Sequence, residues 1–117
     1  MTSRAARINM IRAGVRLSGQ VAELKDVSLT GALMTLDTAL AVGSRHVLRM
    51  MVGTHILELD ARVVRVKALV HEHPRRWEIG VTYIDVAPDA RRAIPAIVAK
   101  LTAALDPRPR RPRGSDG

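Results

Sequence analysis

The chain has 117 residues and a formal net charge of +8, from 19 Lys and Arg against 11 Asp and Glu. Its length fits one domain, and its core must be aliphatic because aromatic residues make up only 2% of it and Phe is absent. Since the chain has no Cys, disulfides, thiolate catalysis and Cys-type zinc sites are excluded, and we expect a cytoplasmic protein. The positive charge favours an anionic partner: a nucleic acid, a phosphate-bearing ligand or an acidic protein surface.

In chain order, the pattern predicts an arm followed by six strands. Residues 1–8 show little periodicity and are expected to form a mobile basic arm. Alternating and β-branched segments follow, separated by turn residues. The predicted strands span residues 9–17, 20–27, 32–36, 45–52, 55–70 and 76–85. Two-residue hairpin turns are predicted at Ser18-Gly19 and at Gly53-Thr54.

Two of these strands are irregular in pattern. The second alternates imperfectly, with Val21 and Val27 on one face against Ala22 and Leu24 on the other. In the long fifth strand, the segment Asp60-Ala61 predicts a bend or bulge.

A helix is predicted after the last strand. Pro88 suits its first turn and is followed by the acidic Asp89. An apolar stripe at helical spacing comprises Ile94, Ile97, Val98, Leu101 and Leu105. Pro95 lies within this pattern and predicts a kink, or one short turn followed by a helix that begins near Pro95. The Pro- and Arg-rich residues 106–117 predict a disordered tail.

Short, evenly spaced strands followed by one helix predict a mainly β fold. We expect residues 9–105 to form a six-stranded antiparallel β-barrel, with the C-terminal α-helix covering one opening. No apolar run approaches the roughly 18 residues of a membrane span, and no signal peptide is evident at the N-terminus.

The segment between the second and third predicted strands carries an acid, a hydroxyl and a glycine. Asp26 and Ser28 side chains favour a turn because they hydrogen-bond nearby backbone N–H groups. Gly31 permits a positive φ or the close approach of another group. Such a turn presents a carboxylate, a hydroxyl and N–H groups that can hydrogen-bond the edge of a planar ring. On these residues alone, a plain tight turn between two strands is the simpler interpretation.

This D-x-S-x-x-G pattern, followed by small apolar residues, resembles the signature of PilZ domains. These are small β-barrel modules, many of which bind the bacterial second messenger cyclic di-GMP. Two further segments resemble the family in the right order, Val63-Val64-Arg65-Val66 and Ile79-Gly80-Val81-Thr82-Tyr83-Ile84-Asp85. The resemblance covers residues 20–105 and implies the same barrel with a terminal helix.

The resemblance also implies roles for residues around the turn. Cyclic di-GMP carries two guanines and two phosphates, and Arg suits both because its guanidinium group reaches guanine O6 and N7 and also stacks on purines. In the family, this task is divided between an R-x-x-x-R motif before the first strand and the D-x-S-x-x-G turn. The resemblance makes Asp26 and Ser28 guanine-edge groups and Gly31 the position of close approach.

The arginine motif of this chain is degenerate. The arm offers Arg4 and Arg7, spaced R-x-x-R. Either they form a compressed motif, or Arg4 matches the second arginine of the family and the first is missing. Arg12 and Arg16 fit R-x-x-x-R but leave no room for a full first strand before Asp26, so we interpret them as solvated charge.

The sequence therefore predicts a cytoplasmic, non-enzymatic receptor for cyclic di-GMP that relays the signal to a protein partner. The predicted ligand-binding residues are Arg4, Arg7, Asp26, Ser28 and Gly31, and no metal, cofactor, membrane span or specific nucleic acid is expected. The alternative is a degenerate PilZ module that binds no nucleotide and acts as a protein-interaction adaptor. A third, less favoured interpretation is a basic barrel that binds nucleic acid through phosphate contacts.

Overall fold

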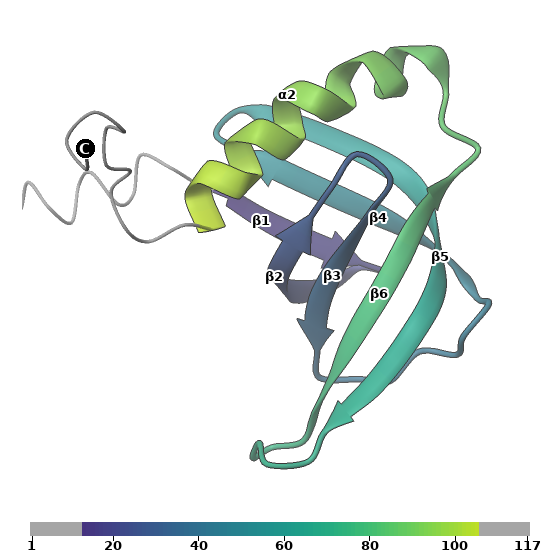
Figure 1. Ribbon diagram of the computed structural model, residues 1–117, viewed down its shortest axis with the longest axis vertical. Coiled ribbons are helices and arrows are strands. Elements are labelled where there is room, and N and C mark those ends of the chain that lie inside the picture. Colours follow the sequence, from purple (N-terminus) through teal and green to yellow (C-terminus); the bar gives the residue numbers. More distant parts are fainter. Residues whose placement is uncertain (1–12, 106–117) are drawn as a thin grey trace, which may run out of the picture.

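The computed structural model of the chain describes residues 13–105. The predictions for the arm, for residues 9–12 of the first strand and for the tail at 106–117 lie outside the described residues. The strands are β1 (Ala13–Leu17), β2 (Gln20–Val27), β3 (Gly31–Leu36), β4 (Arg45–Val52), β5 (His55–Leu69) and β6 (Arg76–Ile84), and the helix is α2 (Pro88–Leu105). All strand pairs are antiparallel, and they close a barrel in the order β1-β2-β3-β6-β5-β4 (Figure 1). The predicted fold is confirmed.

Local chemistry sets most strand ends. Ser18 and Gly19 have φ angles of 56° and 78°, and positive φ at both central residues is the geometry of a two-residue hairpin turn whose twist matches the strands. The turn at Gly53 is also confirmed, with a φ of 60° and Val52 paired with His55. β6 ends at Ile84, one residue earlier than predicted, because the next residue has a left-handed φ that ends extended pairing.

A bulge in β2 changes which of its side chains face the core. Leu24 pairs with Met34 and Asp26 with Leu33, so Lys25 is the extra residue. One extra residue moves every later side chain to the opposite face. Val27 is therefore buried and shares the inner face with Leu24, whereas strict alternation placed it on the outer face.

The bulge in β5 lies further along the strand than predicted. It falls between Val63 and Arg65, and not at Asp60 and Ala61. Gly80 on β6 pairs with Arg65, and a Cβ added to Gly80 would lie 3.3 Å from the Arg65 Cβ. Because Gly80 has no side chain, β6 leaves room for the bulge of β5. The position of the bulge therefore cannot be read from the sequence of β5 alone.

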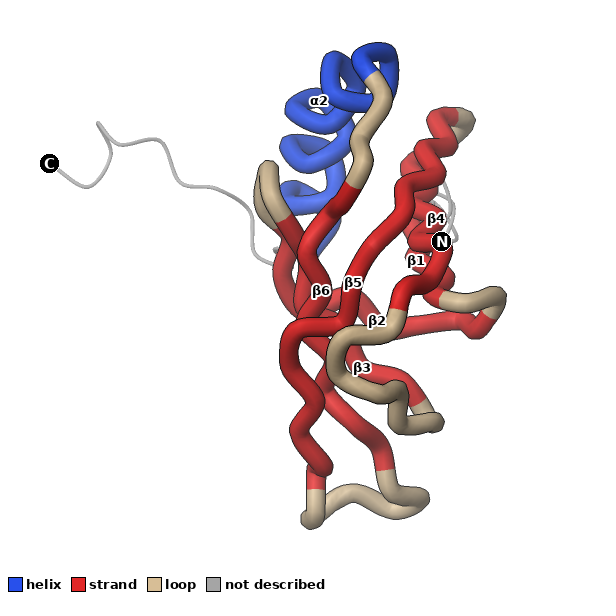
Figure 2. Tube along the Cα trace, turned by 90° about the vertical axis from the view of Figure 1, so that its right-hand side faces the viewer, coloured by secondary structure: helices blue, strands red, loops and turns tan. Residues whose placement is uncertain are grey.

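The core is aliphatic, as predicted, and α2 closes one end of the barrel (Figures 1 and 2). Figure 2 shows the helix in blue beside the ends of the red strands. Ile94, Ile97 and Leu101 of the predicted stripe are buried, and Val98 and Leu105 are partly buried against the same cluster. No helix among residues 13–105 has the length and apolar character needed to cross a membrane.

α2 continues through Pro95 without interruption, so the predicted helix that begins only near Pro95 is wrong. A proline deprives the carbonyl four residues earlier of its hydrogen bond and costs about 3 kcal/mol. Pro95 is on the exposed side of α2, whereas Ile94 and Ile97 are buried, so water can bond the freed carbonyl of Arg91. Each buried Ile or Leu contributes about 2 kcal/mol, and burial of the stripe therefore outweighs the local cost.

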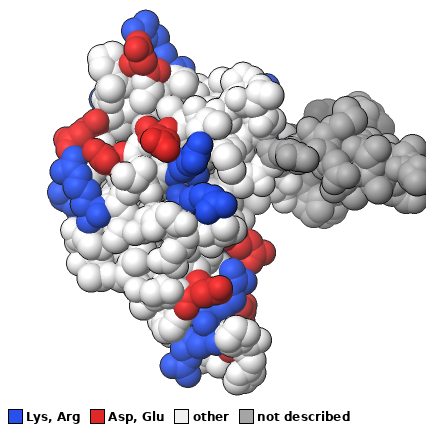
Figure 3. Space-filling model, turned by 180° about the vertical axis from the view of Figure 1, so that it is seen from behind, with Lys and Arg blue, Asp and Glu red and all other residues white. Residues whose placement is uncertain are grey.

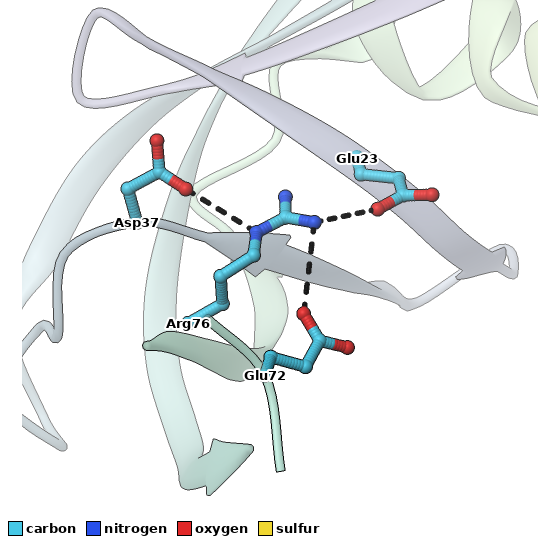
Figure 4. Close-up of polar contacts among 4 residues, drawn as sticks. All are labelled: Glu23, Asp37, Glu72 and Arg76. Atoms are coloured by element: carbon cyan, nitrogen blue, oxygen red, sulfur yellow. Dashed lines mark hydrogen bonds and ion pairs between the residues drawn. The ribbon is translucent and has the colours of Figure 1, made fainter. Parts of the chain in front are cut away.

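Arg76, the first residue of β6, joins three parts of the barrel (Figure 4). Its Nη1 lies 3.0 Å from Glu23 Oε1 on β2, and its Nε lies 3.2 Å from Asp37 Oδ1, just after β3. Glu72, in the loop between β5 and β6, lies 4.0 Å from the same Nη1. The Arg76 side chain is only 27% exposed, and the hydrogen bond to Glu23 is the main reason that its pKa is raised.

We predict that Arg76→Ala destabilises the barrel more than the neighbouring change Arg75→Ala. Loss of Arg76 removes the pairs with its carboxylates and leaves these carboxylates to repel one another, at a cost of about 1 kcal/mol that shrinks in high salt. Arg75 is exposed and has no ion pair among the described residues, so the matched change removes the same charge at a cost of less than about 0.5 kcal/mol. Urea unfolding at low and high salt measures both, and equal losses would contradict the role of Arg76.

Candidate functional site

The turn between β2 and β3 is built around the Ser28 hydroxyl. Its oxygen accepts hydrogen bonds from the backbone N–H groups of Thr30 and Gly31, each over 3.2 Å. The hydroxyl itself donates to the Gly31 carbonyl over 3.2 Å, and the Ser28 backbone N–H donates to that carbonyl over 2.9 Å. The predicted turn is confirmed, and these bonds use the donor and both acceptor positions of the hydroxyl.

At Gly31 the backbones of β3 and β6 approach closely. A Cβ added to Gly31 would overlap the carbonyl oxygen of Val81 and lie 3.3 Å from its carbon. The expected close approach is therefore real, and the approaching group is the β6 backbone. The alternative expectation, a positive φ at Gly31, is wrong. Among residues 13–105 the glycines with a positive φ are Gly19, Gly43 and Gly53.

Tyr83 and Thr82 of β6 hold the turn from its other side. The Tyr83 phenol donates to the carbonyls of Ser28 and Gly31, over 3.0 and 2.9 Å. The Thr30 carbonyl accepts from the Tyr83 backbone N–H over 2.9 Å and from the Thr82 hydroxyl over 3.2 Å. Burial raises the pKa of Tyr83 to about 12, so the phenol stays protonated and remains a donor at neutral pH.

Asp26 is the polar group that the turn leaves available. Its Oδ1 accepts a hydrogen bond from the Val27 N–H over 2.9 Å, and its Oδ2 has no donor among residues 13–105. The side chain is exposed beside a hollow of about 230 Å³, lined by Asp26, Val27, Ser28, Gly31, Ala32, Leu33 and Val81. A carboxylate with one oxygen anchored and the other free suits a pair of N–H donors on a planar ring.

The structure brings together Asp26, Ser28 and Gly31 from the predicted site. Arg4 and Arg7 lie outside the described residues. Arg16 pairs with Val21 near the start of β2, which is about 17 Å of strand from Asp26 at about 3.4 Å per residue.

Trp77 and the segment His71-Glu72-His73 are not part of this site. Trp77 pairs with Leu36 at the far end of β3 from Gly31 and packs against the core, so it takes no part in the turn. Within residues 13–105 no group of His, Asp or Glu side chains is arranged to hold a metal ion, and this includes the segment His71-Glu72-His73.

Sequence reasoning missed the part that Tyr83 plays in the turn. The segment containing Tyr83 resembles the PilZ family, but the pattern does not say what the Tyr83 hydroxyl contacts. The partner carbonyls belong to β3 and its turn, far earlier in the chain. The available signal was that Tyr83 is the single Tyr of the sequence.

Comparisons with known proteins agree with the fold. A family model described as "PilZ domain" matches residues 4–100. The PilZ domain of YcgR from Escherichia coli, solved with c-di-GMP, is similar in fold, with a TM-score of 0.55, 18% identity, and coverage of 80% of this chain and 82% of that one. The PlzA protein of Borreliella burgdorferi in complex with c-di-GMP has a TM-score of 0.54 and 8% identity, and the match covers 97% of this chain and 53% of that one. No curated protein matches the chain by sequence.

We predict that Tyr83 titrates far above the ordinary Tyr range. Because it is the single Tyr of the chain, absorbance of the phenolate reports it directly, with a midpoint at about 12 when folded and about 10 when unfolded in denaturant. A raised folded-state pKa stabilises the fold fully below pH 10, and this contribution is lost as the pH rises from 10 to 12. Tyr83→Phe should cost about 1 kcal/mol at pH 7, and its difference from wild type should shrink over that range. A folded-state midpoint near 10 would contradict the buried donor.

We predict that Gly31→Ala destabilises the protein by about 3 kcal/mol, because an added methyl group forces β3 and β6 apart where backbone meets backbone. Gly14→Ala is the matched control, since a Cβ there would meet only the flexible end of Met51, 3.6 Å away. Thermal unfolding of both variants measures the difference. Equal melting temperatures would show that the strands can separate at Gly31 without cost.

Proposed function

Because the chain belongs to the PilZ domain family, we propose that it is a non-enzymatic cytoplasmic receptor that binds cyclic di-GMP at the turn between β2 and β3. The observation that carries this proposal is the Asp26 carboxylate, which has one oxygen anchored by Val27 and one without a donor among the described residues. Asp26 adjoins a turn that is already held in place by hydrogen bonds of the Ser28 hydroxyl and of Tyr83 on β6. A group held in its binding geometry loses little conformational entropy on binding.

Guanine offers the donor pair that this carboxylate lacks. Its N1–H and its exocyclic N2–H point the same way, so they donate together to the two oxygens of one carboxylate. We assign this contact to Asp26. Ser28 and Gly31 belong to the same site, but their role in the proposal is to shape the turn, since the Ser28 hydroxyl is occupied by Thr30 and Gly31.

The phosphates and the second face of a guanine require cations. Arg4 and Arg7 are placed in this role by their position before the first strand, and Arg combines a fork for phosphate oxygens with a plane for stacking. In the proposed mechanism, the arm folds onto the nucleotide held by Asp26. This changes the surface beside the turn and so alters contact with a protein partner.

Calorimetric titration of the full chain with cyclic di-GMP tests the proposal. We expect saturable binding with a dissociation constant on the order of 1 μM. Asp26→Ala should weaken it at least about tenfold, as should the double change Arg4→Ala with Arg7→Ala, because each removes charge-assisted bonds to the ligand. Asp89→Ala removes an equal charge from the first turn of α2 and should leave affinity unchanged. At saturation, amide exchange should slow in the arm, residues 1–8.

The degenerate spacing of Arg4 and Arg7 motivates the alternative function. In that case the domain binds no nucleotide and acts as a protein-interaction adaptor. No saturable heat at near-millimolar cyclic di-GMP would overturn the receptor function and favour the adaptor. Binding that survives Asp26→Ala would place the nucleotide elsewhere on the barrel.

A further inference from the structure

The outer wall of the barrel holds two arginines in facing positions. The strand register places Arg16 of β1 directly opposite Arg49 of β4, and Arg49 opposite Glu58 of β5. Like charges that face each other across an antiparallel pair destabilise it. The two facing cations therefore lower the stability of the barrel, and they contribute nothing to its core.

Glu58 compensates this charge incompletely. Its Oε2 lies 3.6 Å from Arg49 Nε, which is too long for a hydrogen bond. Arg49 Nε is buried without a hydrogen-bond partner in the described structure. The Arg16 guanidinium has a single long contact there, over 3.4 Å to the Gly19 carbonyl. The group formed by Arg16, Arg49 and Glu58 thus carries an excess positive charge, and its guanidinium N–H groups are not fully hydrogen-bonded among the described residues.

The same side chains line a hollow of about 430 Å³, formed by Arg16, Gly19, Val47, Arg49, Met51 and Glu58. Apolar side chains border it on the outer face. Val47 is 50% exposed, and Ile56, which pairs with Met51, is 54% exposed. Cationic groups flanked by exposed apolar groups are typical of protein interaction surfaces.

We propose that this Arg16–Arg49 hollow is a docking site for an acidic segment of a partner protein, in which a carboxylate has an apolar side chain two residues before it and two residues after it. A carboxylate between the two guanidinium groups accepts hydrogen bonds from both and removes their repulsion. In an extended segment, residues two apart lie on one face about 7 Å apart. Apolar side chains two residues before and after the carboxylate lie on its face and can then cover Val47 and Ile56. Because the described strands close a barrel, this contact is made through side chains and not by strand addition.

Nucleic acid fits this hollow less well. Glu58 lines the hollow and repels phosphates, and exposed Val47 and Ile56 gain nothing from a phosphate backbone. On the face seen in Figure 3, the basic and acidic side chains of residues 13–105 lie side by side in small groups, and those residues form no continuous basic stripe there. An extended cationic surface is the usual electrostatic footprint of nucleic-acid binding.

The hollow is independent of the nucleotide site. Gly19 lies in the turn before β2, whereas Asp26 lies near the end of β2. The test is therefore made without cyclic di-GMP, and its failure would leave the proposed receptor function untouched.

The experiment is an NMR titration of the full chain with the blocked pentapeptide Val-Ser-Glu-Ser-Val, whose Glu and two Val side chains share one face when it is extended. We expect saturable shifts centred on the amides of Arg16, Val47 and Arg49, with a dissociation constant on the order of 1 mM. Arg16→Gln and Arg49→Gln should each weaken binding at least threefold. Arg62→Gln, an equal charge change at an exposed β5 position outside the hollow, should not. Glu58→Gln should tighten binding, because it removes the competing carboxylate.

Control probes identify the occupant. The same pentapeptide with Gln in place of Glu should not bind. No shifts with the Glu peptide, equal binding of the Gln peptide, or shifts outside the hollow would each overturn the proposal. A short thymidine oligonucleotide that binds more tightly and depends on Arg16 would reassign the hollow to nucleic acid. Concentration-dependent dimerisation that Arg49→Gln abolishes would reassign it to a second copy of the chain.

Discussion

The barrel depends on the backbone contact between β3 and β6. It joins strands far apart in the chain, and at Gly31 the two backbones come so close that the Val81 carbonyl lies where a side chain would begin. This contact also brings Tyr83 to the carbonyls of the β2–β3 turn. Closing the barrel and shaping the turn are therefore one event. At the opposite end of β6, Arg76 joins β2 and the end of β3 through carboxylates.

Within the turn, the polar groups divide into those that hold the backbone and one that remains available. The Ser28 hydroxyl and the Tyr83 phenol both form hydrogen bonds with backbone groups of the turn. Asp26 faces outward and Val27 faces inward because the extra residue Lys25, between Leu24 and Asp26, shifts the alternation of the residues that follow it. Without that extra residue, the carboxylate and the apolar side chain would exchange faces, and burying the charge would cost several kcal/mol.

The two proposed surfaces lie toward opposite ends of β2 and have opposite chemistry. Near the end of the strand, Asp26 offers a carboxylate to N–H donors. Beside its start, Arg16 and Arg49 offer guanidinium donors to carboxylates. The hollows beside the two surfaces share no lining residue, so a nucleotide and an acidic partner can occupy them at the same time.

Features that depend on neighbouring residues could be predicted from the amino-acid order. They include the bounds of β2 and β4, the hairpins at Gly19 and Gly53, and the helix start at Pro88. Turn geometry and side-chain periodicity are local, so they are readable from the chain. The bulge opposite Gly80, the bonding of Tyr83 to the turn and the facing arginines could not be predicted in this way and became visible in the folded barrel. Each depends on which distant strand lies alongside, because pairing partners are chosen by closure of the whole barrel and not by any segment alone.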